Sequence, residues 1–360
     1  MREEVLSLVE KYLGKGHFSG DANVQVRCPF HKGGQESRPS FGINVTNGIW
    51  QCFTCKLSGS LPKLLKLLGL PRNIVDLELS GIRDALDANK RSIEWKKRTQ
   101  WKLTDPVLAE TVLPETILRP YEWCPTSLIN AGFSPEWLQW MDIGYDRNNN
   151  RITYPIRDIY GNLAGISGGA TIAGQYPKYK VYQGRRKDKD GNMVGSEYGP
   201  WFDEQYPDYV FKNHRYLWNF DQVYPHLFFN QDKEQYIIIV EGFKACLWLL
   251  QNGWSNTVAL MGSVMSDHQR NLLHRIQARV ILFLDNDTAG RDGTNSIALQ
   301  VQQFEPRVYI AQYPYAEDCQ PDDLSYAELV AAIQGAETYP QWRKRYVDGR
   351  IEKRRTSNNY

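Results

Sequence analysis

Two short cysteine and histidine motifs constrain the N-terminal part of this chain more than any other feature. Residues 28–31 read CPFH and residues 52–55 read CFTC, with 20 residues between them. Each spacing lets two side chains converge on one ion, and two such pairs complete a tetrahedral site with three sulfurs and one imidazole. The closed site predicts one structural zinc in a β-ribbon too small to fold on its own core. The predicted ligands are Cys28, His31, Cys52 and Cys55.

Aromatic and basic side chains surround these motifs, as expected of a small sheet that stacks on bases and contacts phosphates of a single strand. The alternative is that at least two of the aromatic rings form the core of the ribbon. The residues concerned are Phe30, Phe41, Trp50 and Phe53, with Arg27, Lys32, Arg38 and Lys56. Residues 1–71 are predicted to form this zinc-ribbon, DNA-binding domain.

The bulk composition sets only broad limits. A length of 360 residues allows two or three domains. A net charge of +2 gives by itself no argument for nucleic acid, so any basic surface must come from local clustering. The N-terminus does not resemble a signal peptide, and no apolar run approaches the roughly 18 residues of a membrane span. We expect a cytoplasmic protein without a membrane partner, whose six cysteines form no structural disulfides.

Residues 72–115 are rich in charge and predict a linker with some helix. Its basic residues form either a solvated face or a phosphate contact; they are Lys90, Arg91, Lys96, Lys97, Arg98 and Lys102. Residues 116–230 predict a basic subdomain that contains a hairpin. Its strands are 150–158 and 163–167, and Gly165, Gly168 and Gly169 allow close backbone approach.

From residue 235 the pattern alternates between apolar strands and helices. Strands at 236–240, 257–261, 280–284 and 308–313 alternate with helices near 243–252, 266–277 and 291–303. Continuous apolar strands separated by helices predict a parallel sheet covered on both faces. The fold class is therefore multidomain, α+β and α/β: a zinc ribbon, then a mixed core with a parallel sheet over 231–336. Residues 337–360 are expected to form a frayed basic tail.

Acidic residues follow three of these strands. Glu241 comes directly after 236–240, Asp285 and Asp287 directly after 280–284, and Asp318 and Asp322 beyond the fourth strand. The carboxyl ends of parallel strands meet at one crevice. Carboxylates held together repel unless a cation neutralises them, which predicts catalytic Mg²⁺ or Mn²⁺. Such ions clamp triphosphate oxygens and activate an attacking hydroxyl.

In this order the motifs resemble those of the bacterial and phage Toprim-type DNA primases. They are CPFH with CFTC, NRITYPIRD at 150–158, PKY at 177–179, VEG at 240–242, LDNDTAGRDG at 284–293 and PDDL at 321–324. The resemblance covers nearly the whole chain except residues 72–115 and the tail. It implies a template-directed RNA polymerase that makes short RNA primers de novo on single-stranded DNA from ribonucleoside triphosphates.

The resemblance also assigns roles to the matching residues. Glu241, Asp285 and Asp287 would be catalytic and bind magnesium, with Asp318 and Asp322 as the further acidic pair. Four basic residues would hold the incoming nucleotide or the template; the alternative is that they are ordinary surface bases on strands. They are Arg151, Arg157, Lys178 and Lys180.

Three departures from the family pattern stand out. Ala245 occupies a position where the family usually has an acid, and Cys319 and Gln320 stretch the last acidic pair, so the number and placement of metals are open. Residues 183–211, with Arg185, Arg186 and Lys187, suggest an inserted loop that touches DNA. Without a helicase-binding domain or a P-loop, the chain suggests a compact phage-type primase that works with a separate helicase. The competing functions are a Toprim nuclease or topoisomerase and a non-catalytic primase-like DNA-binding protein.

Overall fold

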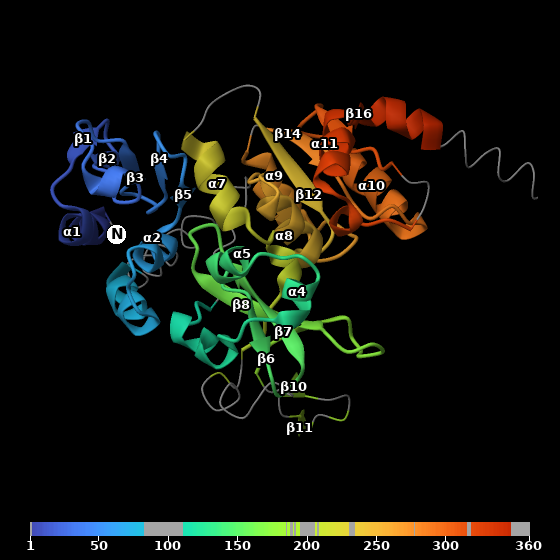
Figure 1. Ribbon diagram of the computed structural model, residues 1–360, viewed down its shortest axis with the longest axis horizontal. Coiled ribbons are helices and arrows are strands. Elements are labelled where there is room, and N and C mark those ends of the chain that lie inside the picture. The colour runs from blue at the N-terminus through green and yellow to red at the C-terminus, as the bar shows by residue number, and fades with distance from the viewer. Residues whose placement is uncertain are drawn as a thin grey trace, which may run out of the picture. The chain divides into compact units, whose positions relative to one another are not determined.

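The structure is a computed structural model, shown in Figure 1, that describes most of the chain. The described residues are 2–82, 111–184, 186–187, 190, 192–194, 206, 209–229, 235–276, 278–314 and 318–346. They form two compact units. The first unit comprises Met1–Asn213 and Phe220–Phe229, and the second comprises His214–Asn219 and Asn230–Tyr360.

The first unit begins with a five-stranded antiparallel sheet in the order β1-β2-β3-β4-β5. The CFTC motif begins at Cys52, the last residue of β4, and the fully buried Phe41 and Trp50 stack at 4.9 Å in the core of the sheet. Pro62 near the start of α2 and Gly69 beyond its end, with φ of +83°, limit that helix. The elements are α1 (Arg2–Leu13), β1 (His17–Ser19), β2 (Asn23–Val26), β3 (Phe41–Asn44), β4 (Trp50–Cys52), β5 (Ser58–Gly59) and α2 (Leu61–Leu67).

The core of the ribbon reaches beyond residue 71. Residues 72–82 are helical, and Val75, Leu79 and Ile82 are buried in the same cluster as Phe41. These three side chains recur at helical spacing, so one face of the helix is apolar. The expected linker at 72–115 is therefore wrong at its start. Its central basic cluster lies outside the described residues.

The second sheet of the first unit is antiparallel, in the order β6-β7-β8-β9. The predicted hairpin is confirmed as β7 paired with β8. Gly165 and Gly168 do admit close approach, because a Cβ there would lie 2.5 Å from the Phe211 ring and 2.7 Å from the Tyr182 ring. The elements are a 3₁₀ helix (Glu115–Tyr121), α4 (Thr126–Asn130), α5 (Pro135–Trp140), β6 (Gly144–Asp146), β7 (Arg151–Arg157), β8 (Leu163–Ala170) and β9 (Tyr179–Val181).

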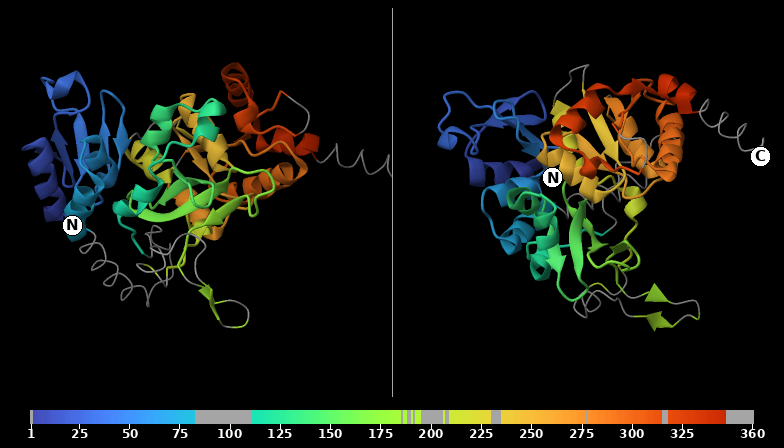
Figure 2. Two further views of the ribbon diagram at one scale, coloured as in Figure 1. Left: turned by 60° about the horizontal axis from the view of Figure 1, so that its bottom comes forward. Right: turned by 45° about the vertical axis from the view of Figure 1, so that its right-hand side comes forward.

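Two further pieces complete the first unit. A short hairpin of β10 (Arg186–Lys187) and β11 (Met193–Val194) lies away from the four-stranded sheet, as Figure 2 shows. Arg185 lies outside the described residues. Helix α7 (Phe220–Phe229) packs against β4 and β5 of the ribbon.

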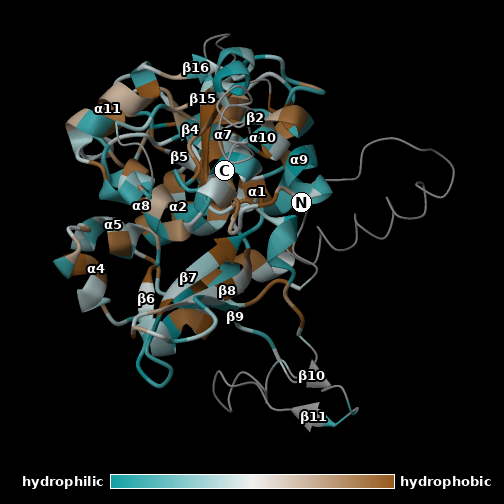
Figure 3. Ribbon diagram, turned by 90° about the vertical axis from the view of Figure 1, so that its right-hand side faces the viewer, coloured by the Kyte–Doolittle hydropathy of each residue, from teal (hydrophilic) through white to brown (hydrophobic). Residues whose placement is uncertain are grey.

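The second unit is a mixed sheet in the order β13-β12-β14-β15-β16. Its first four strands are parallel, as predicted, and β16 is antiparallel to β15. The strands are mostly hydrophobic, whereas the helices combine hydrophobic and hydrophilic residues, as Figure 3 shows. The elements are β12 (Tyr236–Val240), α8 (Phe243–Gln251), β13 (Thr257–Ala259), α9 (Asp267–His274), β14 (Arg279–Leu282), α10 (Thr288–Val301), β15 (Val308–Ile310), a 3₁₀ helix (Pro321–Asp323), α11 (Tyr326–Gln334) and β16 (Glu337–Thr338).

The boundaries of the second unit differ from those predicted. Residues 214–219 belong to it, since Trp218 bridges to Ala259 at the sheet edge. The expected tail begins too early, because Glu337–Thr338 is strand β16 and residues 339–346 are helical, with Tyr339 and Trp342 buried. Residues 347–360 lie outside the described residues. None of the described helices has the length and apolar character needed to span a membrane.

Candidate zinc site and acidic sheet edge

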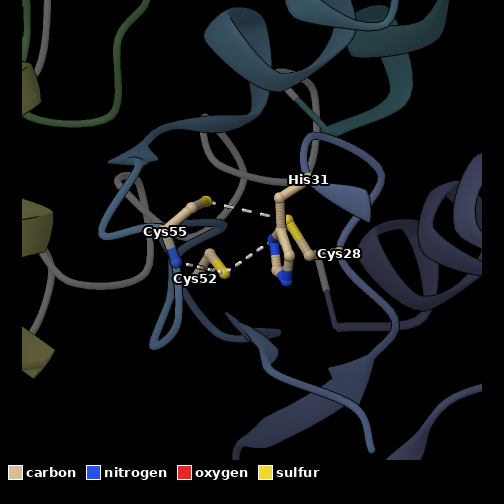
Figure 4. Close-up of side chains that lie close together, drawn as sticks. All are labelled: Cys28, His31, Cys52 and Cys55. Atoms are coloured by element: carbon tan, nitrogen blue, oxygen red, sulfur yellow. Dashed lines mark hydrogen bonds between the residues drawn. The ribbon is translucent and has the colours of Figure 1, made fainter. Parts of the chain in front are cut away.

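The four predicted zinc ligands converge in the first unit, as Figure 4 shows. One ligand atom from each of them lies within 4.8 Å of the others. Cys28 Sγ and Cys55 Sγ are 3.9 Å apart, and Cys52 Sγ is 3.7 Å from His31 Nδ1. Among the described residues this is the one such cysteine, histidine or carboxylate cluster found. The set matches a closed zinc site of three thiolates and one imidazole.

Glu36 supports this cluster, and the sequence motif did not reveal it. His31 presents Nδ1 to the cysteines, while its Nε2 lies 3.0 Å from a Glu36 carboxylate oxygen. Nε2 makes no hydrogen bond, so the Glu36 carboxylate acts on the imidazole through its nearby negative charge alone. Glu36 also accepts hydrogen bonds from the backbone N–H of Cys28 and from Ser40. A carboxylate behind a metal-binding histidine fixes the imidazole orientation and raises its basicity.

Burial and hydrogen bonding shift the pKa values of the three cysteine thiols in different directions. Burial raises the pKa of Cys28 to about 12, and burial likewise raises the pKa of Cys55. Burial also acts to raise the pKa of Cys52, but hydrogen bonds from Ser40 and from the Cys55 backbone outweigh it and the net shift is downward. A coordinating cation replaces the proton of such thiols outright. The cluster therefore suits Zn²⁺.

The aromatic rings of the ribbon divide between the two predicted roles. Phe41 and Trp50 are fully buried, and Phe30 packs 5.9 Å from each, so the core alternative is confirmed for Phe41 and Trp50. Phe53 is 40% exposed and touches Phe229 of α7 edge-on. The basic residues are all exposed; they are Arg27, Lys32, Arg38 and Lys56.

In the second unit, strand register places the main acids at one edge of the sheet. Ile239 of β12 is level with Leu282 of the neighbouring β14 in the parallel ladder. Glu241 lies two residues beyond Ile239, and Asp285 three residues beyond Leu282. Both therefore leave the sheet at the carboxyl ends of adjacent central strands, where open α/β sheets bind ligands.

Backbone hydrogen bonds join the later acidic segment to this edge. The Asn286 N–H donates to the Cys319 carbonyl at 2.8 Å, and the Asp318 N–H donates to the Asn286 carbonyl at 3.1 Å. Asp318 has a φ of +56°, a strained backbone conformation at the turn that these bonds hold. Asp318 is thus held by the backbone of Asn286, the residue that follows Asp285.

The local electrostatics reflect this gathering of carboxylates. Burial raises the pKa of Tyr313, and the charges of Asp285, Asp322 and Asp323 raise it further. Burial and the same carboxylates, together with Glu328, raise the pKa of Cys319. Ionisation of a tyrosine or cysteine to a negative charge is unfavourable beside several carboxylates, whereas a cation at the same place is favoured. The carboxylates therefore make this edge of the sheet favourable for cations, although among the described residues their oxygens do not converge as the zinc ligands do.

Two acids already have protein partners. Asp287 caps α10 by accepting from the Gly290 N–H at 2.6 Å. Asp322 pairs at 3.0 Å with Lys244, the residue that precedes the buried Ala245. A lysine that neutralises Asp322 reduces the carboxylate charge available to metal at this corner of the edge.

The four predicted basic residues occupy different settings. Arg157 is buried in ion pairs with Glu115 at 2.5 Å and Asp142 at 2.8 Å, so the expectation that it holds nucleotide or template does not fit its position. Arg151 is only 4% exposed, and its guanidinium donates to the carbonyls of Gly168 and Pro177. Lys178 is exposed and Lys180 half-buried. Arg151 thus positions the segment from which Lys178 projects.

The partners of Arg157 belong to a buried charge network that sequence patterns did not indicate. Glu115 is fully buried, and Arg72 contacts both Glu115 at 3.3 Å and Asp142 at 3.2 Å. Lys66 joins the same two carboxylates. The residues come from distant points of the sequence, and only folding reveals that each base meets an acid.

The two folded parts match known protein families. Residues 2–68 match the CHC2 zinc finger, and residues 238–324 match a Toprim-like family. The crystal structure of the Aquifex aeolicus primase, with its zinc binding and RNA polymerase domains, has a similar fold. The two share 20% identity with a TM-score of 0.52, over 97% of this chain and 87% of that chain. A zinc ribbon followed by a mixed α/β core with a Toprim domain is thereby established.

Similar curated proteins include DNA primases. That of Staphylococcus aureus (strain COL) is 26% identical over 89% of this chain and 56% of its own length. That of Listeria innocua is 24% identical over 94% of this chain and 56% of its own length. The chain thus spans about half the length of these relatives. The predicted resemblance to DnaG-like, Toprim-type DNA primases with an N-terminal zinc ribbon is confirmed.

Proposed function

We propose that this protein is a DNA primase, a nucleotidyltransferase that makes short RNA primers de novo on a single-stranded DNA template. The observation that carries the proposal is the position of Glu241 and Asp285 at the carboxyl ends of adjacent parallel strands. The zinc ribbon and the similarity to DNA primases give further support for this activity.

Glu241, Asp285 and Asp287 would hold the catalytic metal, with Asp318 contributing through its connection to Asn286. Mg²⁺ or Mn²⁺, when bound, supplies positive charge to triphosphate oxygens and acidifies an attacking hydroxyl. Asp287 would use the oxygen that does not cap α10. Asp322 would take part only if its ion pair with Lys244 opened.

Lys178 and Lys180 would contact phosphates of the incoming ribonucleoside triphosphate or of the template, because they are the less buried bases of the predicted set. Arg151 would hold their segment in place through its bonds to the Gly168 and Pro177 carbonyls. The exposed bases and Phe53 of the ribbon would help select the initiation site on single-stranded DNA. A separate replicative helicase in the bacterial cytoplasm, or in the host cytoplasm for a phage protein, would be the partner.

A non-catalytic DNA-binding protein is the second candidate, favoured by the Lys244–Asp322 ion pair and by Ala245. An assay separates the two: purified protein, single-stranded DNA, Mg²⁺, four ribonucleotides and a γ-labelled purine triphosphate. Labelled oligoribonucleotides that vanish with EDTA and in Asp285→Ala are expected. Asp267→Ala, which removes an acid 80% exposed on α9, serves as the control and should keep activity.

Absence of product with Mg²⁺ or Mn²⁺ on a range of templates would overturn the polymerase assignment in favour of the non-catalytic one. Degraded template would indicate a nuclease instead. Normal synthesis by Asp285→Ala would overturn the metal assignment.

A further inference from the structure

A pocket of about 460 Å³ opens beside the acidic edge of the second unit. Asp285 and Asn286 lie at one side of it, α10 contributes Arg291, and the helix over 339–346 contributes its aromatic face. That helix is the red one after β16 in Figure 1. The predicted frayed tail thus provides one wall of a cavity that touches a candidate metal ligand.

The wall from this last helix is a pair of stacked rings. Trp342 and Tyr346 are one helical turn apart, and their rings stack at 4.7 Å with an interplanar angle of 13°. Trp342 is only 8% exposed, and the hydroxyl of Tyr346 bonds to Asp292 on α10. The ring pair is therefore fixed on both sides, and a rigid aromatic face is the surface on which a nucleobase stacks.

Two arginines line the pocket beside Asp285, and their guanidinium groups can contact an anion. Arg291 and Arg345 outnumber Asp285 among the described residues that line it. Arg291 is held by Asn286 at 3.2 Å, and Arg345 is held by Gln312 at 2.6 Å and by Glu337 at 2.9 Å. Guanidinium groups fixed in this way present their remaining N–H donors to phosphate with little further loss of side-chain freedom.

The size of the pocket favours a single nucleotide over a nucleic-acid strand as its ligand. Small-molecule sites in proteins enclose about 300–1,000 Å³, and 460 Å³ lies at the lower end of that range. A single strand instead follows an open groove several nucleotides long. A stacking face, two arginines and an adjacent metal ligand together match one nucleoside triphosphate.

We infer that this pocket binds the base and ribose of a ribonucleoside triphosphate, with Tyr346 as the stacking residue and the phosphates directed toward Asp285. The inference rests on the proposed function and deepens it. It assigns nucleotide recognition to the helix over 339–346, which the sequence motifs do not include. Arg345 and Arg291 would neutralise the phosphates that lie between the base and the acidic edge.

The test is equilibrium binding of ATP, adenosine and inorganic triphosphate to the full chain, measured by calorimetry with Mg²⁺. Tyr346→Ala should weaken ATP and adenosine binding about tenfold, since one stacked base contributes on that order. Binding of inorganic triphosphate should stay unchanged, because it has no base. Tyr346→Phe should lose much less ATP and adenosine binding than Tyr346→Ala, since it keeps the stacking ring and loses only the bond to Asp292. Tyr326→Ala, which removes an aromatic ring 61% exposed on α11, is the matched control.

Unchanged ATP binding by Tyr346→Ala, or an equal loss for inorganic triphosphate, would overturn the inference. So would a loss of binding to single-stranded DNA with ATP binding intact, which would make the pocket a template site. These outcomes differ from failure of the proposed function. If the protein makes no primers but binds ATP through Tyr346, the nucleotide pocket stands and the proposed function fails. If Tyr346→Ala makes primers and binds ATP normally, the proposed function stands and the pocket assignment fails.

Discussion

A Cβ atom at Gly290 would lie 2.0 Å from the carbonyl oxygen of Asp285, and 2.8 Å from its carbonyl carbon. The first turn of α10 therefore approaches the backbone of the loop over 285–287, called the acidic loop below, as closely as a glycine permits. The Gly290 N–H also bonds to the Asp287 carboxylate, so a single residue holds the positions of two predicted metal ligands.

Gly290→Ala should accordingly displace the acidic loop and abolish primer synthesis, with a loss of stability of about 1–3 kcal/mol from overpacking. Primer synthesis and chemical denaturation measure the two effects. Gly81→Ala is the control, since a Cβ at Gly81 meets nothing within 4 Å. It should leave activity intact and change stability by less than about 1 kcal/mol. An active Gly290→Ala would mean that the loop tolerates displacement.

Cys52→Ala should lose the zinc ion and, with it, the choice of initiation site, because three ligands cannot close the tetrahedral site. Zinc content by atomic absorption and mapping of primer starts are the measurements. Cys124→Ala, at an exposed cysteine outside the cluster, is the control and should retain one zinc. If Cys52→Ala kept one zinc and the same start sites, the ligand set would be wrong.

Glu36→Gln should weaken zinc affinity about 10–100-fold, the usual effect of removing the carboxylate behind a metal-binding histidine. Competition with a chromogenic chelator measures the affinity. The exposed Glu10→Gln on α1 is the matched control and should not change it. Equal affinities for Glu36→Gln and the wild type would show that the Glu36 contact with His31 does not support the metal.

The buried charge network should make stability depend on acid pH. Burial acts to raise the pKa of Glu115, but Arg157 and Lys66 lower it to about 2, from an ordinary value of 4.5. The folded-state pKa is depressed, so the stabilisation is present above pH 4.5 and is lost as pH falls toward 2. The free energy of unfolding, measured from pH 6 to 2, should decline through this range in the wild type.

Glu115→Gln should flatten that decline and destabilise the protein by about 3–5 kcal/mol at neutral pH, because the buried Arg157 loses one of its two carboxylate partners and keeps only Asp142. Arg270→Gln removes an exposed ion pair with Asp267 and should cost at most about 1 kcal/mol. An unaltered pH profile in Glu115→Gln would mean that other acids govern acid unfolding.

Local patterns of sequence determined much of this protein. The spacing of Cys28, His31, Cys52 and Cys55 predicted their convergence, since tetrahedral zinc allows few arrangements of two such pairs. The alternation of apolar strands and helices predicted the parallel sheet and placed Glu241 and Asp285 at one edge, because the direction of a strand fixes which end carries the next residue.

Tertiary structure alone decided which charged residues are accessible. Arg157 has the same local sequence character as a phosphate-binding base, yet Glu115 and Asp142 enclose it from distant segments. Likewise, the polar stretch after residue 337 gave no sign that Trp342 and Tyr346 stack against the unit that holds Asp285. Burial and pairing depend on contacts between residues far apart in sequence, and local patterns contain no information about such contacts.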